Sequence, residues 1–491
     1  MKNQQGWADL YAFRVDRKDD APLFRQIYAQ MRAAILSRAL RAGAKLPSSR
    51  ELAVRLAVSR TAVVAAYEQL LAEGYVTGKT GAGTYIAADL PEPFAGARPR
   101  QKKRTPPAGK ARAPSAQPAR EVMDVTVHSD NRPFNPGRTL VDARTVALWR
   151  KLTARSLRSF NPEHLGYCDP QGTIALRSNV CDYLRAARAV RCDPEQVVIT
   201  AGTQQAIDIV IRILGGPDKD VWVEDPGYPL THAALMAAGV TVHPVPVDEK
   251  GINVKAGKRL APHARAAFVT PSHQFPTGVQ LAMPRRLELL AWAREAGAWI
   301  VEDDYASEFR YGGRPLASLQ GLDDGERVIY IGTLNKALFP GLRLGYAVLP
   351  PSLLRGFVTA RYLMDRQPST LCQSIVADFM EEGHFAAHIR RMRAAYQDQR
   401  DTLVAALRRR LGDHLGVDPP DQGMHLVAYL RRGLSDRVIE RAAREQGVIV
   451  RAMSRMYVAA PARSALMFGF SGYPRQTIGP AVARLAKVFE K

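Results

Sequence analysis

The sequence predicts an α/β protein in two parts: a small helical unit at the N-terminus that ends in a β-hairpin, and a large C-terminal unit built on a mostly parallel sheet. Three observations support this prediction. The chain has 491 residues, which is more than one ordinary domain holds. Residues 91–120 are rich in proline and in basic residues. Beyond them, short apolar runs typical of buried strands alternate with helical stretches.

The segment at 91–120, PEPFAGARPRQKKRTPPAGKARAPSAQPAR, separates the two parts. It holds seven prolines and eight basic residues but a single acidic residue, so it cannot bury an apolar core. We therefore expect three regions: an N-terminal unit at 1–90, a basic linker at 91–120 and a C-terminal unit at 121–491.

Positive charge is concentrated near the N-terminus. The chain has a formal net charge of +22, and residues 1–120 contain 21 Lys and Arg against 9 Asp and Glu, or +12. The remaining residues carry 48 basic against 38 acidic side chains, or +10. A dense positive region favours a polyanionic partner such as nucleic acid. Charge alone leaves a merely solubilising tail as the alternative.

Several classes of protein are disfavoured by what the sequence lacks. No stretch approaches the roughly 20 consecutive apolar residues of a membrane span, and the polar N-terminus lacks the apolar core of a signal peptide. The cysteines form no CxxC pair, so neither a disulfide framework nor a metal site is expected. We expect a bacterial cytoplasmic protein, associated with the nucleoid when bound to DNA, with no membrane partner.

The N-terminal unit contains two short helices separated by a tight turn, in LPSSRELAVRLAVSRTAVVAAYEQLLAEGY. Ser48 and Glu51 have the spacing of a capping box, which predicts that a helix begins there. Ser59 is placed to cap a second helix and Gly74 to end it. The apolar face of this second helix is predicted to hold Val63, Tyr67, Leu70 and Leu71. Because YVTGKTGAGTYIA then reads as strand, turn and strand, the unit is expected to be a winged helix-turn-helix.

Residues 21–87 resemble the winged helix-turn-helix of the GntR regulators, through PLFRQI, LPSSRELA, VSRTAV, AYEQLLAEGY and GAGTYI in that order. The resemblance implies double-stranded operator DNA as a partner. Helix N-termini and arginines suit phosphates and guanine edges. The residues expected to face the duplex are Arg50, Ser59, Arg60, Thr61 and, in the wing, Gly81. Val64 departs from the pattern, since a related regulator type carries a base-reading arginine there.

The large unit is predicted from successive pairs of strand and helix. QVVITAG precedes TQQAIDIVIRIL, DVWVEDPGY precedes THAALMAAG, RAAFVTPS precedes PRRLELLAWAREAG, and AWIVEDDY and RVIYIGT follow. Buried strands that alternate with helices form parallel sheets covered on both faces. Ligand sites in such sheets lie at the carboxyl ends of the strands.

Residues at those strand ends indicate a phosphorylated, planar cofactor. Gly202 and Thr203 begin a helix whose free amides can bind an anion. Tyr228 offers an aromatic face, and IVEDDY places an acid where burial requires a cationic partner. YIGTLNKALFPGLRLGY adds a hydroxyl, an amine and a second cation, at Thr333, Lys336 and Arg343. Pyridoxal 5'-phosphate (PLP) fits these features, because a lysine forms its imine and an acid keeps its ring nitrogen protonated.

Residues 125–491 look like a type-I-fold, PLP-dependent aminotransferase, and their fusion to a GntR-type head resembles the MocR/GabR regulators. The resemblance implies that Lys336 forms the Schiff base with PLP and that Asp303 pairs with the pyridine nitrogen. Spacing to the lysine favours Asp303 over Asp304. The other cofactor contacts that it implies are Tyr305 at the ring hydroxyl, Tyr228 stacked on the ring, and Gly202, Thr203, Thr333 and Arg343 at the phosphate.

The same resemblance also implies that two copies of the chain assemble. Tyr167, in GYCDPQG, matches a tyrosine that aminotransferases lend to the phosphate of the neighbouring subunit. This implies a homodimer, and analogy with the family adds an exchange of domains between its subunits.

Two departures bear on whether the chain is an enzyme. Enzymes of this fold usually have Asn where QFPTG has Phe275. They also bind the substrate carboxylate through an arginine. In this chain the position that aligns with that arginine is Met467, in PARSALMFGFSGY. Arg463 lies four residues earlier, and whether it replaces the missing arginine is left open. Without such an arginine the ligand could be an amine or PLP itself.

We therefore expect a PLP-dependent transcriptional regulator in which an amino compound or PLP acts through Lys336 and alters operator binding. The alternative is a catalytically active aminotransferase that carries a DNA-binding domain. The sequence leaves open whether transamination turns over, which effector binds, which operator is recognised, and whether the outcome is activation or repression.

Overall fold

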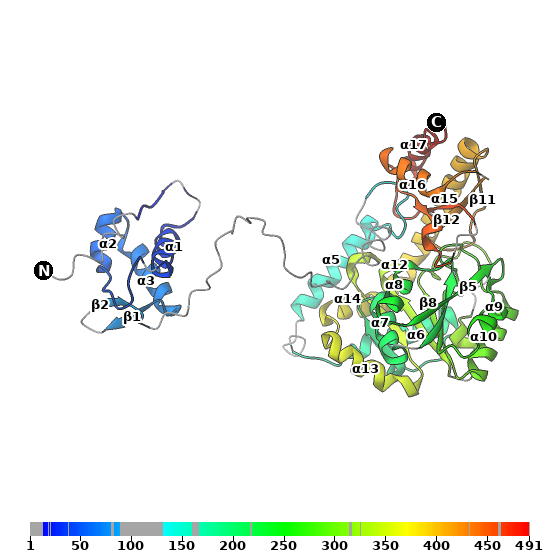
Figure 1. The fold of residues 1–491 in the computed structure, drawn as a ribbon, viewed down its shortest axis with the longest axis horizontal. Coiled ribbons are helices and arrows are strands. Elements are labelled where there is room, and N and C mark those ends of the chain that lie inside the picture. Colours follow the sequence, from blue (N-terminus) through cyan, green and yellow to red (C-terminus); the bar gives the residue numbers. More distant parts are fainter. Residues whose placement is uncertain are drawn as a thin grey trace, which may run out of the picture. The chain divides into compact units, whose positions relative to one another are not determined.

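The structure is a computed structural model that describes residues 13–17, 19, 21–37, 39–79, 83–88, 131–159, 166–216, 219–313, 317–324, 326–431, 433–459 and 463–490. The chain forms two compact units, Met1–Ala111 and Arg112–Lys491 (Figure 1). The linker expected at 91–120 and the wing residue Gly81 lie outside the described residues.

The first unit is a winged helix-turn-helix, as predicted. Helices α1, α2 and α3 share one apolar core, and strands β1 and β2 pair antiparallel to form the wing. Their bounds are Leu23–Leu36 (α1), Ser49–Leu56 (α2), Arg60–Ala72 (α3), Val76–Lys79 (β1) and Gly83–Ile86 (β2). The prediction for Leu71 was wrong, since this side chain is 50% exposed. Leu70 already points into the core, and neighbouring residues on a helix project about 100° apart.

Capping side chains explain where these helices begin. The Ser48 hydroxyl accepts a hydrogen bond from the Glu51 amide at 3.2 Å, and the Glu51 carboxylate accepts one from the Ser48 amide at 2.7 Å. This is the predicted capping box of α2. The Ser59 hydroxyl accepts from the Ala62 amide at 3.3 Å and so caps α3. Both predicted helix starts are confirmed.

The second unit is built on an eight-stranded sheet, with the strand order β3-β10-β9-β8-β7-β4-β5-β6. The pairs among β4, β5, β7, β8 and β9 are parallel. Strand β10 runs antiparallel to β3 and β9, and β6 runs antiparallel to β5. The bounds are Val197–Thr200 (β3), Asp220–Asp225 (β4), Thr241–Asp248 (β5), Gly251–Ile252 (β6), Ala266–Val269 (β7), Trp299–Asp304 (β8), Val328–Thr333 (β9) and Gly345–Val348 (β10). The predicted mostly parallel sheet is confirmed.

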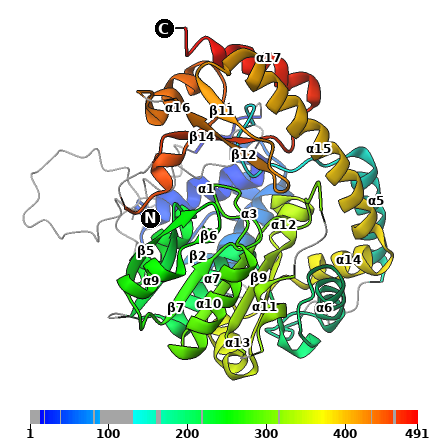
Figure 2. The same cartoon turned by 90° about the vertical axis from the view of Figure 1, so that its right-hand side faces the viewer.

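Helices cover both faces of this sheet (Figure 2). On one face, α7 and α13 pack on alternate residues of the strands, with Ile207 and Phe357 in the shared core. On the other face, Trp222 of β4 stacks on Trp292 of α10 at 3.7 Å between ring centroids. The helices of this part are Ala143–Arg158 (α5), Ile174–Arg188 (α6), Thr203–Leu214 (α7), Pro229–Ala237 (α8), Val254–Leu260 (α9), Met283–Glu295 (α10), Leu319–Leu322 (α11), Leu334–Ala337 (α12), Pro351–Asp365 (α13) and Thr370–Glu381 (α14).

The C-terminal part adds a second, smaller sheet that the strand-and-helix pattern did not predict. It has four antiparallel strands in the order β11-β12-β14-β13, flanked by the long helix α15 (Figure 2). The bounds are His384–Leu411 (α15), Leu415–Val417 (β11), His425–Leu430 (β12), Asp436–Glu445 (α16), Arg451–Ala452 (β13), Ala465–Gly469 (β14) and Arg475–Ala486 (α17). Among the described residues of the unit, short 3-10 helices lie at Pro194–Gln196 (η3), Pro340–Leu342 (η4) and Met453–Met456 (η5).

Two classes of site are not found in the part of the chain that the structure describes. None of its helices is both long enough and apolar enough to cross a bilayer. Among the same residues, no three His, Cys, Asp or Glu side chains come together as they would around a metal ion.

Candidate functional site

A cavity of about 380 Å³ lies at the carboxyl ends of the central strands. Strands β3, β4, β7, β8 and β9 each contribute a residue at or just beyond their last position, as expected for a sheet of this type. The lining residues that the sequence singled out are Gly202, Thr203, Tyr228, Asp303, Tyr305, Thr333, Lys336 and Arg343. Residues spread over more than 140 positions of the sequence therefore meet around one cavity.

The N-terminus of α7 forms one end of the cavity. Gly202 is its N-cap residue and has a φ of +121°, which favours glycine. A Cβ at this position would lie 2.8 Å from Asn335 Nδ2 and within 3.8 Å of the Arg343 guanidinium. Free amides of a helix start and an arginine beside them make a binding place for an anion.

The segment after β9 fixes the lysine and the arginine of the cavity. Thr333 accepts a hydrogen bond from the Asn335 amide at 3.1 Å, which starts the short helix α12. The Asn335 side chain accepts one from the Leu344 amide at 2.8 Å, which closes the loop between them. Arg343 has a φ of +53° at the turn of this loop, a conformation rare for a residue with a side chain.

Lys336 projects from α12 into the cavity. Its ammonium nitrogen donates a hydrogen bond to the Gly137 carbonyl at 3.2 Å. Burial lowers the pKa of Lys336 to about 8, although the nearby Asp303 carboxylate opposes this shift. A substantial fraction of the side chain is therefore the neutral, nucleophilic amine near physiological pH.

The two neighbouring acids at the end of β8 have different surroundings, because successive residues of a strand face opposite sides of the sheet. Asp303 lines the cavity, and its Oδ1 has no hydrogen-bond partner among the described residues. Burial, Asp304 and Glu224 raise the pKa of Asp303 to about 7.

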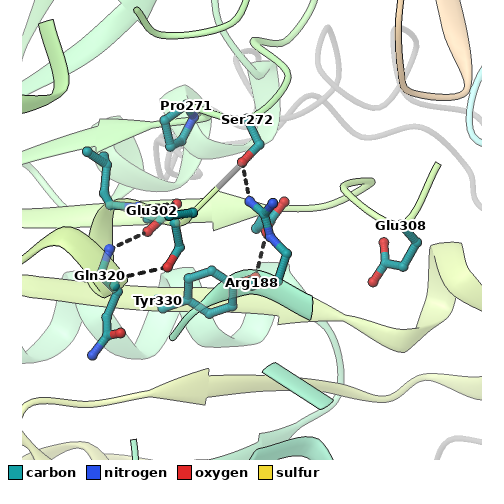
Figure 3. Close-up of polar contacts among 12 residues, drawn as sticks. Arg188, Pro271, Ser272, Glu302, Glu308, Gln320 and Tyr330 are labelled. Atoms are coloured by element: carbon teal, nitrogen blue, oxygen red, sulfur yellow. Dashed lines mark hydrogen bonds and ion pairs between the residues drawn. The ribbon is translucent and has the colours of Figure 1, made fainter. Parts of the chain in front are cut away.

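Asp304 lies on the opposite side and bonds to Arg188 and Tyr330, two of the residues labelled in the polar cluster of Figure 3. It accepts hydrogen bonds from Arg188 Nε at 2.8 Å and from the Tyr330 hydroxyl at 2.5 Å. The Arg188–Asp304 ion pair is nearly sealed from solvent, with side-chain exposures of 6% and 1%. In the same cluster Glu302 accepts from the backbone amides at 319 and 320. The acid available to a ligand is thus Asp303.

This difference predicts that substitutions at the two acids affect stability differently. Asp304→Asn is expected to lower the free energy of unfolding by about 3 kcal/mol, because it leaves the buried Arg188 cation without its carboxylate. Asp303→Asn is expected not to lower it, because burial already disfavours the charged form of that carboxyl. Denaturant titration of both variants checks the prediction, and equal losses for the two would contradict it.

Aromatic side chains form the walls beside the lysine. Phe275 packs edge-on against Tyr228 at 5.2 Å, His425 at 5.4 Å and Tyr305 at 6.1 Å between centroids. Tyr305 Oη has no hydrogen-bond partner among the described residues. Burial lowers the pKa of His425 to about 4, so this ring is neutral at physiological pH. A planar ligand with a few polar substituents matches such walls.

Tyr167 is the one predicted cofactor contact that the structure does not bring to this chain's own cavity. Its side chain is 81% exposed and lies under the Arg366 guanidinium at 4.4 Å. The prediction assigned this tyrosine to the cavity of a second subunit, so its distance from the cavity of its own chain leaves that prediction untested.

Several lining residues were missed by sequence reasoning. Asn335 and His425 line the cavity together with three methionines, Met424, Met456 and Met467. Arg451 lines it as well, whereas Arg463 stacks on the Tyr429 ring at 3.9 Å and is not among the lining residues. Asn335 adjoins Lys336 and could have been proposed, but nothing in the sequence near Arg451 signals that β13 reaches the cavity.

The helix-turn-helix brings the predicted DNA contacts together at two helix starts. Arg50 lies in the first turn of α2, and Ser59, Arg60 and Thr61 lie at the start of α3. All four side chains are exposed. Arg60 Nε donates to the Ser49 hydroxyl at 3.2 Å, so the two starts adjoin. Two helix N-termini and two arginines on adjoining positions suit a phosphate backbone and its groove.

The same two parts are found by comparison with known families. Residues 23–86 match the bacterial regulatory proteins of the gntR family, and residues 135–485 match the family of aminotransferases of class I and II.

Relatives share both parts in one chain. The protein is 40% identical over 480 residues to the probable rhizopine catabolism regulatory protein MocR of Rhizobium meliloti, which covers 97% of this chain and 95% of that one. It is 31% identical over 466 residues to the HTH-type pyridoxine biosynthesis transcriptional regulator PdxR of Corynebacterium glutamicum, with 94% of each chain covered.

Solved structures resemble the large unit. The α-aminoadipate aminotransferase LysN from Thermus thermophilus, complexed with N-(5'-phosphopyridoxyl)-L-leucine, matches with a TM-score of 0.69 and 28% identity, over 77% of this chain and 95% of that one. A multiple substrate aminotransferase from Thermococcus profundus matches with a TM-score of 0.70 and 26% identity, over 78% and 97%.

Proposed function

This chain belongs to the MocR-type transcriptional regulators, in which a GntR-family helix-turn-helix is fused to an aminotransferase class I and II domain, and we propose that it is a PLP-dependent sensor of an amino compound. The relatives are named for rhizopine catabolism and for pyridoxine biosynthesis, so no relative's name identifies the effector of this chain. The proposal rests on one observation: a buried lysine of lowered pKa shares a cavity with an acid whose Oδ1 has no hydrogen-bond partner among the described residues, and with a helix N-terminus and an arginine that suit an anion.

The residues of the cavity fit PLP. Asp303 Oδ1 and Tyr305 Oη are buried polar atoms without a partner among the described residues, and such atoms are rare unless a ligand or water satisfies them. A protonated pyridine nitrogen suits the first and a ring hydroxyl suits the second. The amides at the start of α7 with Arg343 suit a phosphate. The related fold of LysN was solved with a phosphopyridoxyl amino acid.

Each residue then has a role. With PLP bound, Gly202, Thr203, Thr333 and Arg343 would hold the phosphate. Tyr228 would lie against the ring, Tyr305 would bond to the ring hydroxyl, and Asp303 would keep the ring nitrogen protonated. Bound PLP supplies an aldehyde carbon at which one amine can replace another. Lys336 is the resident amine, and its lowered pKa keeps it reactive and exchangeable. Phe275 and the methionines exclude water from this exchange.

Effector binding changes DNA binding only through a difference in the effector's affinity for two arrangements of the protein. An incoming amine that took the place of Lys336 on the cofactor would free this side chain, which links α12 to the cavity. We also propose that two chains form the working unit, with Tyr167 of each completing the phosphate site of the other, since its side chain is exposed in a single chain.

Operator binding by the full-length protein tests this function. An operator is first selected from random duplex DNA, and its dissociation constant is measured with PLP, with amines, and with both. We expect a change of at least about fivefold that requires PLP and amine together, which is the low end of typical coupling between sites. If operator affinity changes with neither PLP nor amine, and the protein turns over an amino donor, the alternative of an enzyme that carries a DNA-binding domain is supported instead.

A further inference from the structure

We propose that Arg17 binds a phosphate of the DNA backbone, so that an N-terminal arm holds the operator together with the two helix starts. The N-terminal arm is residues 13–17, which precede the match of residues 23–86 to the gntR family. The juxtaposition that carries the inference is an exposed guanidinium that is fixed at the turn between α2 and α3. The contact involves no cofactor, so the inference goes beyond the proposed sensor function and does not depend on it.

The N-terminal arm is part of the folded DNA-binding unit. Phe13 and Val15 are half-buried and pack against the apolar core that α1, α2 and α3 share, whereas Arg14 and Asp16 are exposed. Side chains that alternate in this way between core and solvent are typical of an extended chain. The packing of two apolar side chains therefore sets the direction in which the arm runs toward Arg17.

Two glutamines of α1 hold the backbone of the arm. Gln30 accepts a hydrogen bond from the Arg14 amide at 3.0 Å and donates one to the Arg14 carbonyl at 2.6 Å. Gln26 accepts from the Asp16 amide at 2.8 Å and donates to the Asp16 carbonyl at 2.8 Å. Residues two apart on an extended chain are separated by about 6.6 Å, and residues four apart on a helix by about 6 Å. The two spacings match, so each glutamine pairs with one residue of the arm as a neighbouring strand would.

The arm ends with Arg17 at the turn of the helix-turn-helix. Arg17 Nη2 donates a hydrogen bond to the Ala57 carbonyl at 2.6 Å. Ala57 is the C-cap residue of α2, and Ser59, two residues later, is the N-cap residue of α3. The bond therefore holds the Arg17 guanidinium beside the turn that joins the end of α2 to the start of α3.

The Arg17 guanidinium keeps N–H groups for a further partner. An arginine side chain has five N–H donors, and the Ala57 carbonyl takes one of them. Within the part of the chain that the structure describes, no carboxylate forms an ion pair with Arg17, and the side chain is exposed. A guanidinium with spare donors and no acidic partner suits the oxygens of a phosphate.

The position of Arg17 fits the backbone of a duplex bound to this motif. In a helix-turn-helix the second helix enters the major groove with its N-terminal residues, and the first helix crosses the backbone. Arg50 lies at the start of α2, and Arg17 lies at its other end, about 12 Å away for a helix of eight residues. Successive phosphates of one strand are about 3.4 Å apart along the duplex axis. The two ends of α2 therefore reach different phosphates, and Arg17 adds a contact that Arg50 cannot make.

The test measures how full-length protein binds labelled operator and an unrelated duplex of equal length at several salt concentrations. Arg17→Ala is expected to lower the affinity for both duplexes by the same factor, about tenfold, because a phosphate contact carries no sequence information. The plot of log affinity against log salt concentration should become shallower by about 0.9 for each copy of Arg17 that is lost. Arg17→Lys should keep the salt dependence and lose part of the affinity, because an ammonium group lacks the fork of donors.

Two further variants show whether the fixed position of the cation matters. Arg14→Ala removes the same charge from the same arm, but Arg14 is bonded through its backbone and not to the turn, so affinity should stay within about twofold. Gln26→Met with Gln30→Met releases the arm and should cost most of what Arg17→Ala costs. Adding Arg17→Ala to that pair should then cost little more, because both changes remove one contact. Denaturant titration shows that each variant is folded.

Three outcomes would overturn the phosphate contact. The first is an unchanged affinity of Arg17→Ala protein for both duplexes. The second is a loss confined to the operator with an unchanged salt dependence, which would mean that Arg17 braces the turn instead of binding phosphate. The third is an equal loss for Arg14→Ala, since the general charge of the arm would then explain both. The sensor function stands or falls separately, by the response of operator binding to PLP and amine.

Discussion

Lys336→Ala protein mixed with PLP is expected to develop no cofactor absorbance in the visible range and to carry no adduct after borohydride reduction. The reason is that Lys336 is the one lysine among the described residues that line the cavity. The variant should still fold, because it removes a cation whose pKa burial has lowered and thereby relieves a desolvation cost. Its operator affinity should no longer respond to PLP and amine together. Mass spectrometry of the reduced peptide and the operator assay check these outcomes.

The wild-type reaction has a distinct pH dependence. Only the neutral amine attacks an aldehyde, and burial lowers the pKa of Lys336 to about 8. The rate of PLP incorporation should therefore rise with pH up to about 8 and level off above it, whereas a solvated lysine would continue to gain reactivity toward its ordinary pKa of about 10.4.

A surface lysine provides the control. Lys258 pairs with Glu295 at 3.2 Å and is not among the residues that line the cavity, so Lys258→Ala should incorporate PLP as the wild type does. A trapped adduct on any residue but Lys336, or normal incorporation by Lys336→Ala, would show that the cavity is not the cofactor site.

The second large effect is expected for the double variant Arg50→Ala with Arg60→Ala, whose operator affinity should fall by about 100-fold. Each arginine that contacts a base or phosphate contributes about 1 to 3 kcal/mol, and tenfold in affinity corresponds to about 1.4 kcal/mol. Stability should change little, since both side chains are exposed and Arg60 loses one exposed hydrogen bond to Ser49. Fluorescence anisotropy with labelled operator measures the loss, and the salt dependence should become shallower as phosphate contacts disappear.

Arg32→Ala is the matched control for that variant. Arg32 donates from Nε to the Tyr75 hydroxyl at 3.0 Å, close to Glu73 at the C-terminal end of α3 and thus away from the start of that helix. Its operator affinity should stay within about twofold of the wild type. Comparable losses for Arg32→Ala and for the double variant would mean that general positive charge, rather than the two helix starts, holds the DNA.

Local patterns carried much of the prediction. The capping box at Ser48 and the cap at Ser59 fixed two helix starts because each depends on hydrogen bonds within four residues. The apolar strands and the helices between them predicted the parallel sheet, and the rule that ligands lie at strand ends predicted that Gly202, Asp303 and Lys336 would meet. Leu71 was misplaced because two adjacent leucines share an apolar signal and only packing selects the one that faces inward.

By itself, then, the sequence determined the two units, the helix starts and the strand ends where the polar residues gather, because these follow from periodicity and short-range bonding. Spacing to Lys336 favoured Asp303 over Asp304, but only the tertiary structure gave the physical reason: Asp304 accepts a hydrogen bond from Arg188, 116 positions earlier in the chain. Only the tertiary structure showed that Arg451 lies opposite Met467. The pairing of two strands is set by the packing of the whole sheet, so the residues adjacent to Arg451 or Met467 in the sequence do not reveal it.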